Sequence, residues 1–200
     1  LSKKELVCNA VCNGVIQSTV TSGTPGYIYQ WYTGNGTSIN PGNSTDISNL
    51  CWGEYSLEVT DFNGCIVYAS ELIDEPDSII LNSPIVNNVG CNGECNGSID
   101  VIVLGGVAPY NFLWNDPNTQ NTALASSLCI GTYELTITDQ NGCIVTLIDS
   151  IIEPDPLMVT IDNIVDAYCK ESLDGAIDIT ISGGSPIYTI EWVSQTNEIF

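Results

Sequence analysis

The feature that most constrains the fold of this chain is an internal repeat of its cysteines. Two cysteines recur 83 positions further on, two recur 78 positions further on, and a ninth opens a third copy. The matched pairs are Cys8 and Cys91, Cys12 and Cys95, Cys51 and Cys129, and Cys65 and Cys143, with Cys169 as the ninth. Solenoid repeats span only about 20 to 50 residues. The longer period predicts that each copy is a small domain in its own right.

Other landmarks keep the same register and set the expected domain boundaries. They are Gly14, Gly97 and Gly175; Gly23, Gly106 and Gly184; Trp31, Trp114 and Trp192; and Glu-Pro-Asp at 75–77 and 153–155. Residues 1–75 are predicted to form a first repeat with an incomplete first strand, 76–154 a full second repeat, and 155–200 the N-terminal half of a third.

Apolar residues alternate with polar ones inside each copy. Ile99, Val101 and Val103 share one face of such a run, which is typical of a strand with one buried face. No stretch has the sustained three-and-four spacing of an amphipathic helix. Asn-Gly at 63–64 and 141–142 separates alternating runs, where it favours a hairpin turn. The pattern predicts an all-β fold of tandem immunoglobulin-like antiparallel β-sandwich domains.

Charge and composition exclude several classes of function. The net charge is -21, with 24 acidic residues, 3 lysines and neither arginine nor histidine. We expect no binding to nucleic acid or to an anionic membrane surface, because both need Lys and Arg to neutralise phosphates. We also expect no membrane insertion, because the apolar runs are far shorter than about 18 residues. Without histidine, this sequence can form neither a Ser-His-Asp site nor a His-ligated zinc site.

The nine cysteines favour an oxidising, extracellular environment. A cytosolic zinc protein is the alternative, but its ligands would cluster as Cys-x-x-Cys pairs, and the sequence has none. The chain begins without Met or a signal-peptide core and ends inside a strand-like run. We therefore expect it to be a segment of a longer exported protein.

The second copy carries an ordered set of short motifs. It reads CNGECNGSIDVIVLGGVAPYNFLW at 91–114, SLCIGTYELTITDQNGC at 127–143 and IIEPD at 151–155. In this order the motifs resemble the SprB-type repeat of very large surface adhesins of gliding bacteria. The resemblance implies type IX export, display on the cell surface at the outer membrane, tandem arrays, and roles in adhesion and gliding. Two departures are SGTPGYIY at 22–29, where GGxxPY is expected, and Leu173 in place of a cysteine.

Two disulfides within copies follow from the expected strand order. Cys95 precedes the second strand and Cys129 lies in the turn before Gly-Thr-Tyr, and a sandwich places both at the same pole. We therefore predict Cys95 to pair with Cys129 and, in the first copy, Cys12 with Cys51. Each bond would contribute about 3 to 4 kcal/mol by closing its loop.

The pairing of Cys143 is left open among three alternatives. A bond to Cys91 would join opposite poles, about 26 to 34 Å apart for a strand of about 8 to 10 residues, whereas a disulfide needs alpha carbons within about 7 Å. A bond to Cys8 would cross the junction between neighbouring domains, and we favour it as a hypothesis. Free thiols are the third alternative. The partners of Cys65, Cys91 and Cys169 are not assigned.

The remaining candidate sites rest on weaker patterns. We expect no cofactor and no metal site. The Glu-Pro-Asp junctions, with Asp74 nearby, could hold calcium between domains, but we favour solvated linker charge there. TDFNGC and TDQNGC fail as EF-hand loops, because their twelfth positions are Leu72 and Ser150. Asp-Ser-Ile at 77–79 and 149–151 resembles a bacterial O-glycosylation signal, which makes Ser78 and Ser150 candidate acceptors.

Aromatic triplets such as Tyr110, Phe112 and Trp114 could bind sugars, but rings that share one face more often fill a core. The sequence therefore predicts a non-catalytic repeat segment of a giant extracellular adhesin, forming a disulfide-braced stalk or filament. Its expected partners are neighbouring repeats, further copies in filaments, and a surface glycan or substratum. The alternatives are a glycan- or partner-binding module and an enzyme with paired carboxylates.

Overall fold

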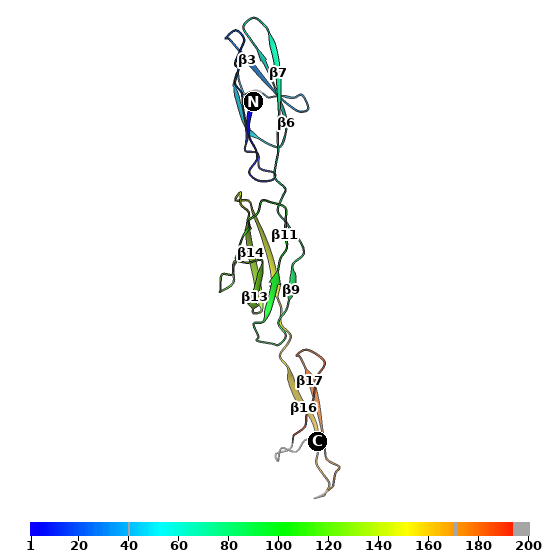
Figure 1. Ribbon diagram of the computed structural model, residues 1–200. Coiled ribbons are helices and arrows are strands. Elements are labelled where there is room, and N and C mark those ends of the chain that lie inside the picture. The colour runs from blue at the N-terminus through cyan, green and yellow to red at the C-terminus, as the bar shows by residue number, and fades with distance from the viewer. Residues whose placement is uncertain (40, 170–171, 194–200) are drawn as a thin grey trace. The chain divides into compact units, whose positions relative to one another are not determined.

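The computed structural model describes residues 1–39, 41–169 and 172–193. Part of the predicted third repeat, residues 170–171 and 194–200, therefore lies outside the described residues. The described chain consists of β-strands and their connections (Figure 1). None of its elements is a helix long and apolar enough to cross a membrane. The predicted all-β class is confirmed.

The first copy is a sandwich of two antiparallel sheets. Its strands are β1 (Ser2–Lys4), β2 (Gly14–Gln17), β3 (Ile28–Thr33), β4 (Ser38–Ile39), β5 (Asp46–Leu50), β6 (Gly53–Thr60) and β7 (Ile66–Ile73). One sheet has the order β1-β2-β5 and the other β4-β3-β6-β7. Ile16 and Ile47 from the first sheet share a buried cluster with Trp31 and Leu57 from the second. The core therefore lies between the sheets, as the alternation of apolar residues requires.

The second copy forms three sheets where the first forms two. Its strands are β8 (Ile80–Leu81), β9 (Ile85–Asn87), β10 (Gly97–Asp100), β11 (Val103–Leu104), β12 (Asn111–Trp114), β13 (Leu124–Leu128), β14 (Gly131–Thr138) and β15 (Ile144–Ile151). They form sheets of order β13-β10-β9, β11-β8 and β12-β14-β15.

Nine buried apolar side chains of the first copy each have a buried counterpart in the second copy, which also buries Val101. In the first copy they are Leu6, Ile16, Trp31, Ile47, Leu50, Tyr55, Leu57, Val59 and Ile73, and their counterparts Val89, Ile99, Trp114, Ala125, Leu128, Tyr133, Leu135, Ile137 and Ile151 are also buried. Burial therefore follows the repeat register that the cysteines establish.

Two aromatic hydrogen bonds recur in each sandwich. The indole Nε1 of Trp114 donates to the carbonyl oxygen of Thr122, and the Tyr133 hydroxyl donates to that of Cys129, four residues upstream. In the first copy, Trp31 and Tyr55 make the corresponding bonds. A central Trp and a Tyr bonded to nearby upstream backbone are features of immunoglobulin-like domains.

The predicted strand through Ile99 and Val103 is divided in two. β10 pairs with β9 and β11 pairs with β8, and Pro84 lies between β8 and β9. Proline has no N–H to donate to a ladder, which accounts for the interruption of the strand pair.

The third copy has Asp162 at the position of Pro84, and its strands are continuous there. β16 (Met158–Val165) pairs with β17 (Ala176–Ser182), with a register shift between Ile161 and Asn163. These strands are largely exposed.

The described chain divides into two compact units. Unit 1 comprises Leu1–Asn82, Val103–Asn111 and Thr136–Val145, and unit 2 comprises Ser83–Ile102, Phe112–Leu135 and Thr146–Phe200. The division passes through the second copy, so the repeat boundaries 1–75, 76–154 and 155–200 stay a prediction.

Candidate functional site

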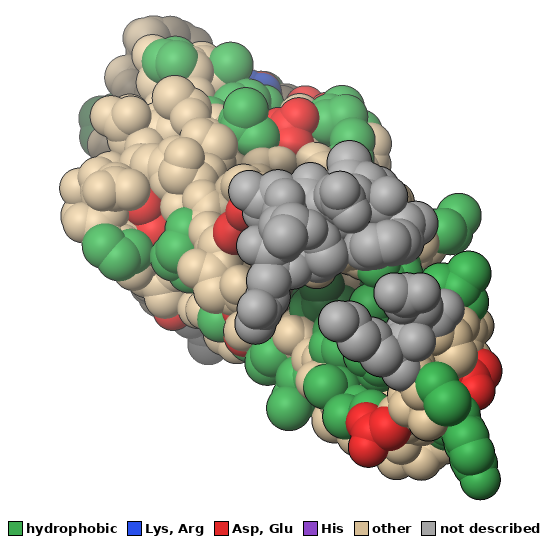
Figure 2. Space-filling view, turned by 90° about the horizontal axis from the view of Figure 1, so that it is seen from below, with side chains coloured by type: hydrophobic (Ala, Val, Ile, Leu, Met, Phe, Trp, Pro, Cys, Tyr) green, Lys and Arg blue, Asp and Glu red, His purple; other side chains and the backbone are tan. Residues whose placement is uncertain are grey.

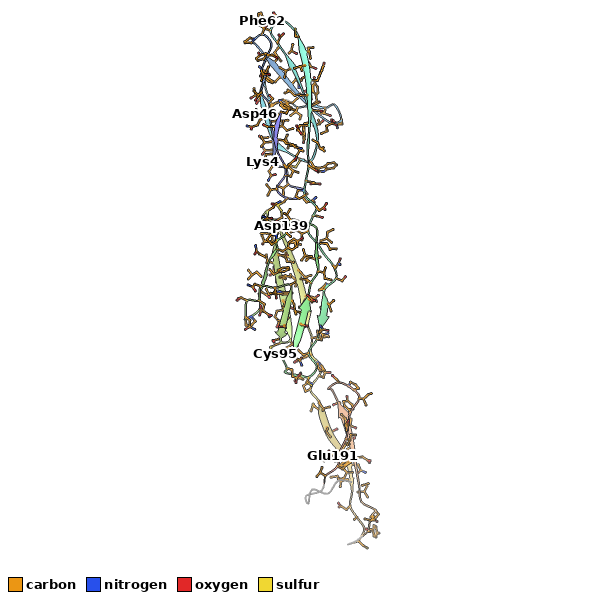
Figure 3. All side chains as sticks on the ribbon, in the orientation of Figure 1. Lys4, Asp46, Phe62, Cys95, Asp139 and Glu191 are labelled. Atoms are coloured by element: carbon orange, nitrogen blue, oxygen red, sulfur yellow. A yellow bond between two sulfur atoms is a disulfide. The ribbon has the colours of Figure 1, made fainter. Side chains whose placement is uncertain are left out.

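The turn between β14 and β15 is organised around Asp139, which is labelled in Figure 3. One carboxylate oxygen, Oδ1, accepts hydrogen bonds of 2.9 Å from the backbone N–H groups of Asn141 and Cys143. The other, Oδ2, accepts a 3.0 Å bond from the N–H of Val107. These three bonds hold the Asn-Gly turn and fix the backbone from which Cys143 projects.

The charge of Asp139 suits this role. Its side chain is only 3% exposed. Burial raises the pKa of the carboxyl group, but the N–H donors of Val107, Cys143 and Asn141 lower it more, and the net pKa is below its ordinary value. The group is therefore an ionised acceptor at neutral pH.

The same arrangement surrounds Asp61 in the first copy. Asp61 accepts hydrogen bonds from the backbone N–H groups of Thr24 at 3.1 Å and of Asn63 and Cys65 at 2.9 Å. The bond from Thr24, followed by that from Cys65, lowers the pKa of Asp61. The turn is thus a property of the repeat rather than of one copy.

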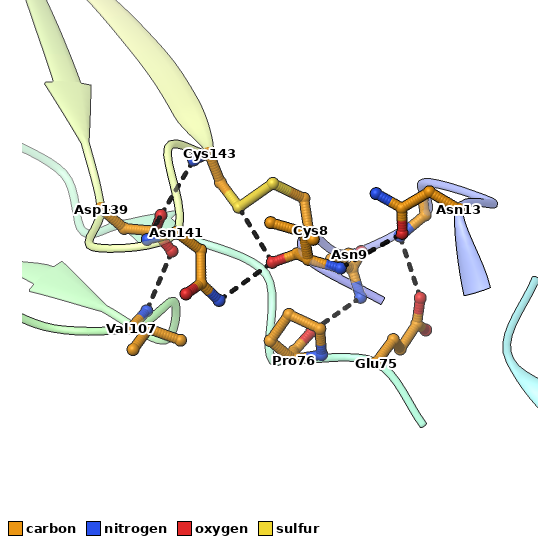
Figure 4. The surroundings of a disulfide bond; sticks show 11 residues. Cys8, Asn9, Asn13, Glu75, Pro76, Val107, Asp139, Asn141 and Cys143 are labelled. Carbon is orange, nitrogen blue, oxygen red and sulfur yellow. Dashed lines mark hydrogen bonds between the residues drawn. A yellow bond between two sulfur atoms is a disulfide. The ribbon is translucent and has the colours of Figure 1, made fainter. Parts of the chain in front are cut away.

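The loop that carries Cys8 is held by the segment that leaves the first copy. The Glu75 carboxylate accepts a 2.9 Å hydrogen bond from the N–H of Ala10, and the amide of Asn9 donates to the carbonyl oxygen of Pro76 at 3.3 Å (Figure 4). The next carbonyl, that of Asp77, accepts a 3.0 Å bond from Gly106 of the second copy. The Glu-Pro-Asp segment therefore contacts both copies.

The second copy holds its own cysteine loop in the same way. Glu153 accepts from the N–H of Gly93 at 2.8 Å, and Asn92 donates to the carbonyl oxygen of Pro154 at 3.1 Å. Within the described chain, no three His, Cys, Asp or Glu side chains form a group suited to a metal ion. Calcium at these junctions stays the alternative to the predicted solvated linker charge.

Cys8 and Cys143 are joined by a disulfide bond (Figure 4). They are 135 positions apart in the sequence, their alpha carbons are 5.7 Å apart, and both belong to unit 1. Beside the bond, the amide of Asn141 donates a 3.0 Å hydrogen bond to the carbonyl oxygen of Val7, and Sγ of Cys143 lies 3.4 Å from the same oxygen. A turn of the second copy is thus bonded to a loop of the first.

The other predicted cysteine pairs also lie together. The structure joins Cys12 to Cys51 and Cys95 to Cys129, which are 39 and 34 positions apart. Cys65, Cys91 and Cys169 are free and exposed. The alternative bond from Cys91 to Cys143 is absent from this arrangement, because Cys143 is bonded to Cys8.

Comparison with protein families places this geometry in context. The family model described as SprB repeat matches residues 83–119 and 161–197. The SprB repeat family model thus matches part of the second copy and part of the third. The resemblance seen in the sequence is therefore confirmed at these two places. A SprB repeat indicates a repeat segment of an extracellular surface adhesin, a class of structural rather than enzymatic domains.

Solved structures to which the chain is similar share low sequence identity with it. They are the amphioxus IgVJ-C2 molecule (19% identity, 72% of this chain and 97% of that one, TM-score 0.32), Dpr2 Ig1-Ig2 in complex with DIP-Theta Ig1-Ig3 (13%, 80% and 66%, 0.29) and murine CEACAM1b (14%, 73% and 94%, 0.27). No curated protein matched the chain.

The predicted modification sites lie at the surface of the chain. Ser78 and Ser150 are both exposed, and the Ser150 hydroxyl is 3.1 Å from that of Thr132. O-glycosylation stays a prediction.

Figure 2 shows acidic side chains at several separate places among hydrophobic ones on the face that it draws.

Three residues at the junction between the first and second copies were not identified from the sequence as hydrogen-bonding partners. They are Asn9, Glu75 and Asn141. Asn9 and Glu75 recur as Asn92 and Glu153, with the same roles. Their recurrence in register is the signal that could have identified them.

Proposed function

We propose that this chain is a stalk segment of a giant surface adhesin in which neighbouring SprB repeats are tied by a disulfide at their junction. The observation that carries the proposal is the bond between Cys8 of the first copy and Cys143 of the second. It adds a second covalent connection beside the peptide segment at 75–77. The expected setting is the cell surface, after type IX export, in adhesion and gliding.

Two further features support a structural role. The Glu75, Asn9 and Asp77 hydrogen bonds use the linker as a fixed part of the junction rather than as a loose tether. Because the net charge is -21, neighbouring repeats carry charge of the same sign. Their repulsion extends about 8 Å at physiological ionic strength and opposes collapse of the array.

Single-molecule pulling on the ends of the chain tests the proposal. While the Cys8–Cys143 bond is intact, the residues between these cysteines cannot extend. In the double variant Cys8→Ser and Cys143→Ser, the separation of 135, less the 39 and 34 held by the two other disulfides, leaves 62 residues to be released. Full unfolding should then lengthen the chain by roughly 200 Å more than the wild type.

The matched control is Cys65→Ser, which replaces a free cysteine at the equivalent turn. Its contour length should equal that of the wild type. Equal lengths for the double variant and the wild type would mean that the junction bond does not form, and the proposal would fail.

A glycan-binding module is the second candidate, because the first copy exposes large aromatic rings that its second-copy counterparts lack. Trp52, Phe62 and Tyr68 are 66%, 75% and 69% exposed, and their counterparts in the second copy are not aromatic. However, Trp52 precedes β6 and Phe62 follows it, and a strand of eight residues spans about 26 Å. The two rings therefore do not form one platform. Glycan binding that is lost in Trp52→Ala or Phe62→Ala would favour this function.

A further inference from the structure

The three free cysteines occupy the same places in the repeat as the two bonded ones. Cys65 is the counterpart of Cys143, and Cys91 and Cys169 are counterparts of Cys8. The chain thus has two kinds of cysteine besides the pairs inside each copy. Turn cysteines follow Asp-x-Asn-Gly, and loop cysteines open each copy. The bond from Cys8 to Cys143 joins one of each kind.

The free turn cysteine has the backbone geometry of the bonded one. The N–H groups of Cys65 and Cys143 each donate a 2.9 Å hydrogen bond to the aspartate four residues before them. The side chain that differs is the asparagine of the turn. Asn141 donates across the junction to Val7, whereas Asn63 donates to the hydroxyl of Thr24 in its own copy. The turn that holds Cys65 is therefore formed without a partner.

The free loop cysteines also keep the geometry of the bonded one. In each loop, the residue that precedes the cysteine donates its N–H to a side-chain oxygen six residues further along the chain. The third residue after the cysteine donates its N–H to the carbonyl oxygen of the cysteine. The first set of bonds joins Val7 to Asn13, Gly90 to Asn96 and Tyr168 to Asp174, and the second joins Val11 to Cys8, Glu94 to Cys91 and Ser172 to Cys169. Each loop is preformed.

A surface hollow beside Cys91 indicates which kind of segment can bind to its loop. It lies within unit 2 and is lined by Cys91 and Gly90 and by Gly184 and Ser185 of the third copy, among others. Gly90 is the counterpart of Val7, whose carbonyl oxygen accepts the amide of Asn141 at the bonded junction, whereas the Gly90 carbonyl oxygen accepts a 3.1 Å hydrogen bond from the hydroxyl of Ser185. The loop side of the hollow therefore corresponds to the surface that meets a turn.

The other side of the hollow corresponds to residues that hold the turn in place. Gly184 and Ser185 are counterparts of Gly106 and Val107. Val107 donates its N–H to Asp139, and a Cβ atom placed on Gly106 would lie 3.3 Å from the Asp139 carboxylate. Counterparts of residues that flank the Asp139 turn in the second copy thus line the hollow, so the repeat register places an Asp-x-Asn-Gly-Cys turn beside it.

We propose that Cys91 and Cys169 each form a disulfide with the turn cysteine of another copy of this repeat, and that Cys65 forms one with a loop cysteine of another copy. The pairing rule is turn to loop. The inference rests on the proposed function, which it extends from one junction to every junction in an array. In each bond, two thiols lose two protons and two electrons to a small-molecule disulfide oxidant, which is reduced to two thiols.

Disulfide mapping of the purified chain tests the rule. The chain is incubated with oxidised and reduced glutathione, its remaining thiols are alkylated, and the digested peptides are identified without reduction. We expect Cys65 of one molecule to be joined to Cys91 or Cys169 of another. Peptides joining Cys65 to Cys65 or Cys91 to Cys169 as the main products, or alkylated thiols at all three positions, would overturn the proposal.

Variants make the test specific. Cys65→Ser should lose all disulfide-linked oligomers, and so should the double variant Cys91→Ser and Cys169→Ser, whereas Cys91→Ser alone should keep the Cys65–Cys169 peptide. Glu134→Cys adds an exposed thiol outside both motifs. This thiol should remain free during oxidation and should be recovered in its alkylated form. If Glu134→Cys cross-links as readily as Cys65, exposure alone explains the bonding and the rule fails.

The same digest separates this inference from the proposed function. The Cys8–Cys143 peptide reports the junction inside the chain. Its presence without turn-to-loop peptides from the other cysteines would overturn only the inference. Its absence would overturn the proposed function.

Discussion

The Asp139 carboxylate accepts a 2.9 Å hydrogen bond from the backbone of Cys143, the cysteine that is bonded to Cys8. A nearly buried charge thereby fixes the residue that links two repeats. Asp139 also joins this turn to Val107 on the neighbouring connection of its own copy. The junction therefore depends on the internal order of the second sandwich as well as on its sulfur chemistry.

Asp139→Asn should destabilise the second repeat by about 1 to 3 kcal/mol, because the amide nitrogen cannot accept and at least one buried N–H group loses its partner. The measurement is the free energy of unfolding from urea denaturation. Glu134→Gln makes the same chemical change at an exposed strand position and should alter stability by less than about 0.5 kcal/mol. Equal effects of the two variants would contradict the role given to Asp139.

The contribution of Asp139 should depend on pH. Its pKa is lower in the folded chain than its ordinary value, so its stabilisation is fully present above the unfolded pKa of about 3.9 and is lost as the pH falls through the folded pKa. The difference in unfolding free energy between wild type and Asp139→Asn should therefore shrink from pH 7 towards pH 2. A difference that stays constant over this range would show that the charge is not involved.

Trp114→Ala should destabilise the second repeat by about 3 to 5 kcal/mol, because it leaves a cavity between the two sheets and removes the hydrogen bond to Thr122. Trp114 is 1% exposed, whereas Trp52 is 66% exposed. Trp52→Ala is the matched control and should change stability by no more than about 0.5 kcal/mol. Circular dichroism during urea denaturation measures both, and similar losses would place Trp114 outside the core.

Gly105→Ala should be more damaging than Gly142→Ala. Both glycines have a positive φ, of 67° and 84°, so both substitutions incur the cost of about 1 to 2 kcal/mol for a left-handed residue. At Gly105 a Cβ atom would also lie 2.1 Å from the carbonyl oxygen of Ser78, whereas at Gly142 nothing lies within 4 Å. Only Gly105→Ala should therefore displace the backbone beside β8, and thermal unfolding of the two variants compares them. Equal losses would rule out the clash.

Much of the fold could be predicted from local pattern. Alternation and Asn-Gly turns predicted the strands and hairpins, and the recurring tryptophans predicted where each core has its centre. The interruption of the strand pair beside Pro84 was not predicted, since only the pairing of β8 with β11 and of β9 with β10 shows that a missing N–H matters there. Burial of Asp139 was missed because an aspartate in a turn is ordinarily solvated.

The sequence by itself determined the repeat, its β class and the two kinds of cysteine, because these depend on residue identity and spacing along the chain. It left Cys143 with three alternatives, since cysteines 52 or 135 positions apart can be equally close in space. Only the tertiary structure brought the alpha carbons of Cys8 and Cys143 to 5.7 Å and aligned Asn141 with Val7. A disulfide forms between neighbours in three dimensions, and folding decides which cysteines are neighbours.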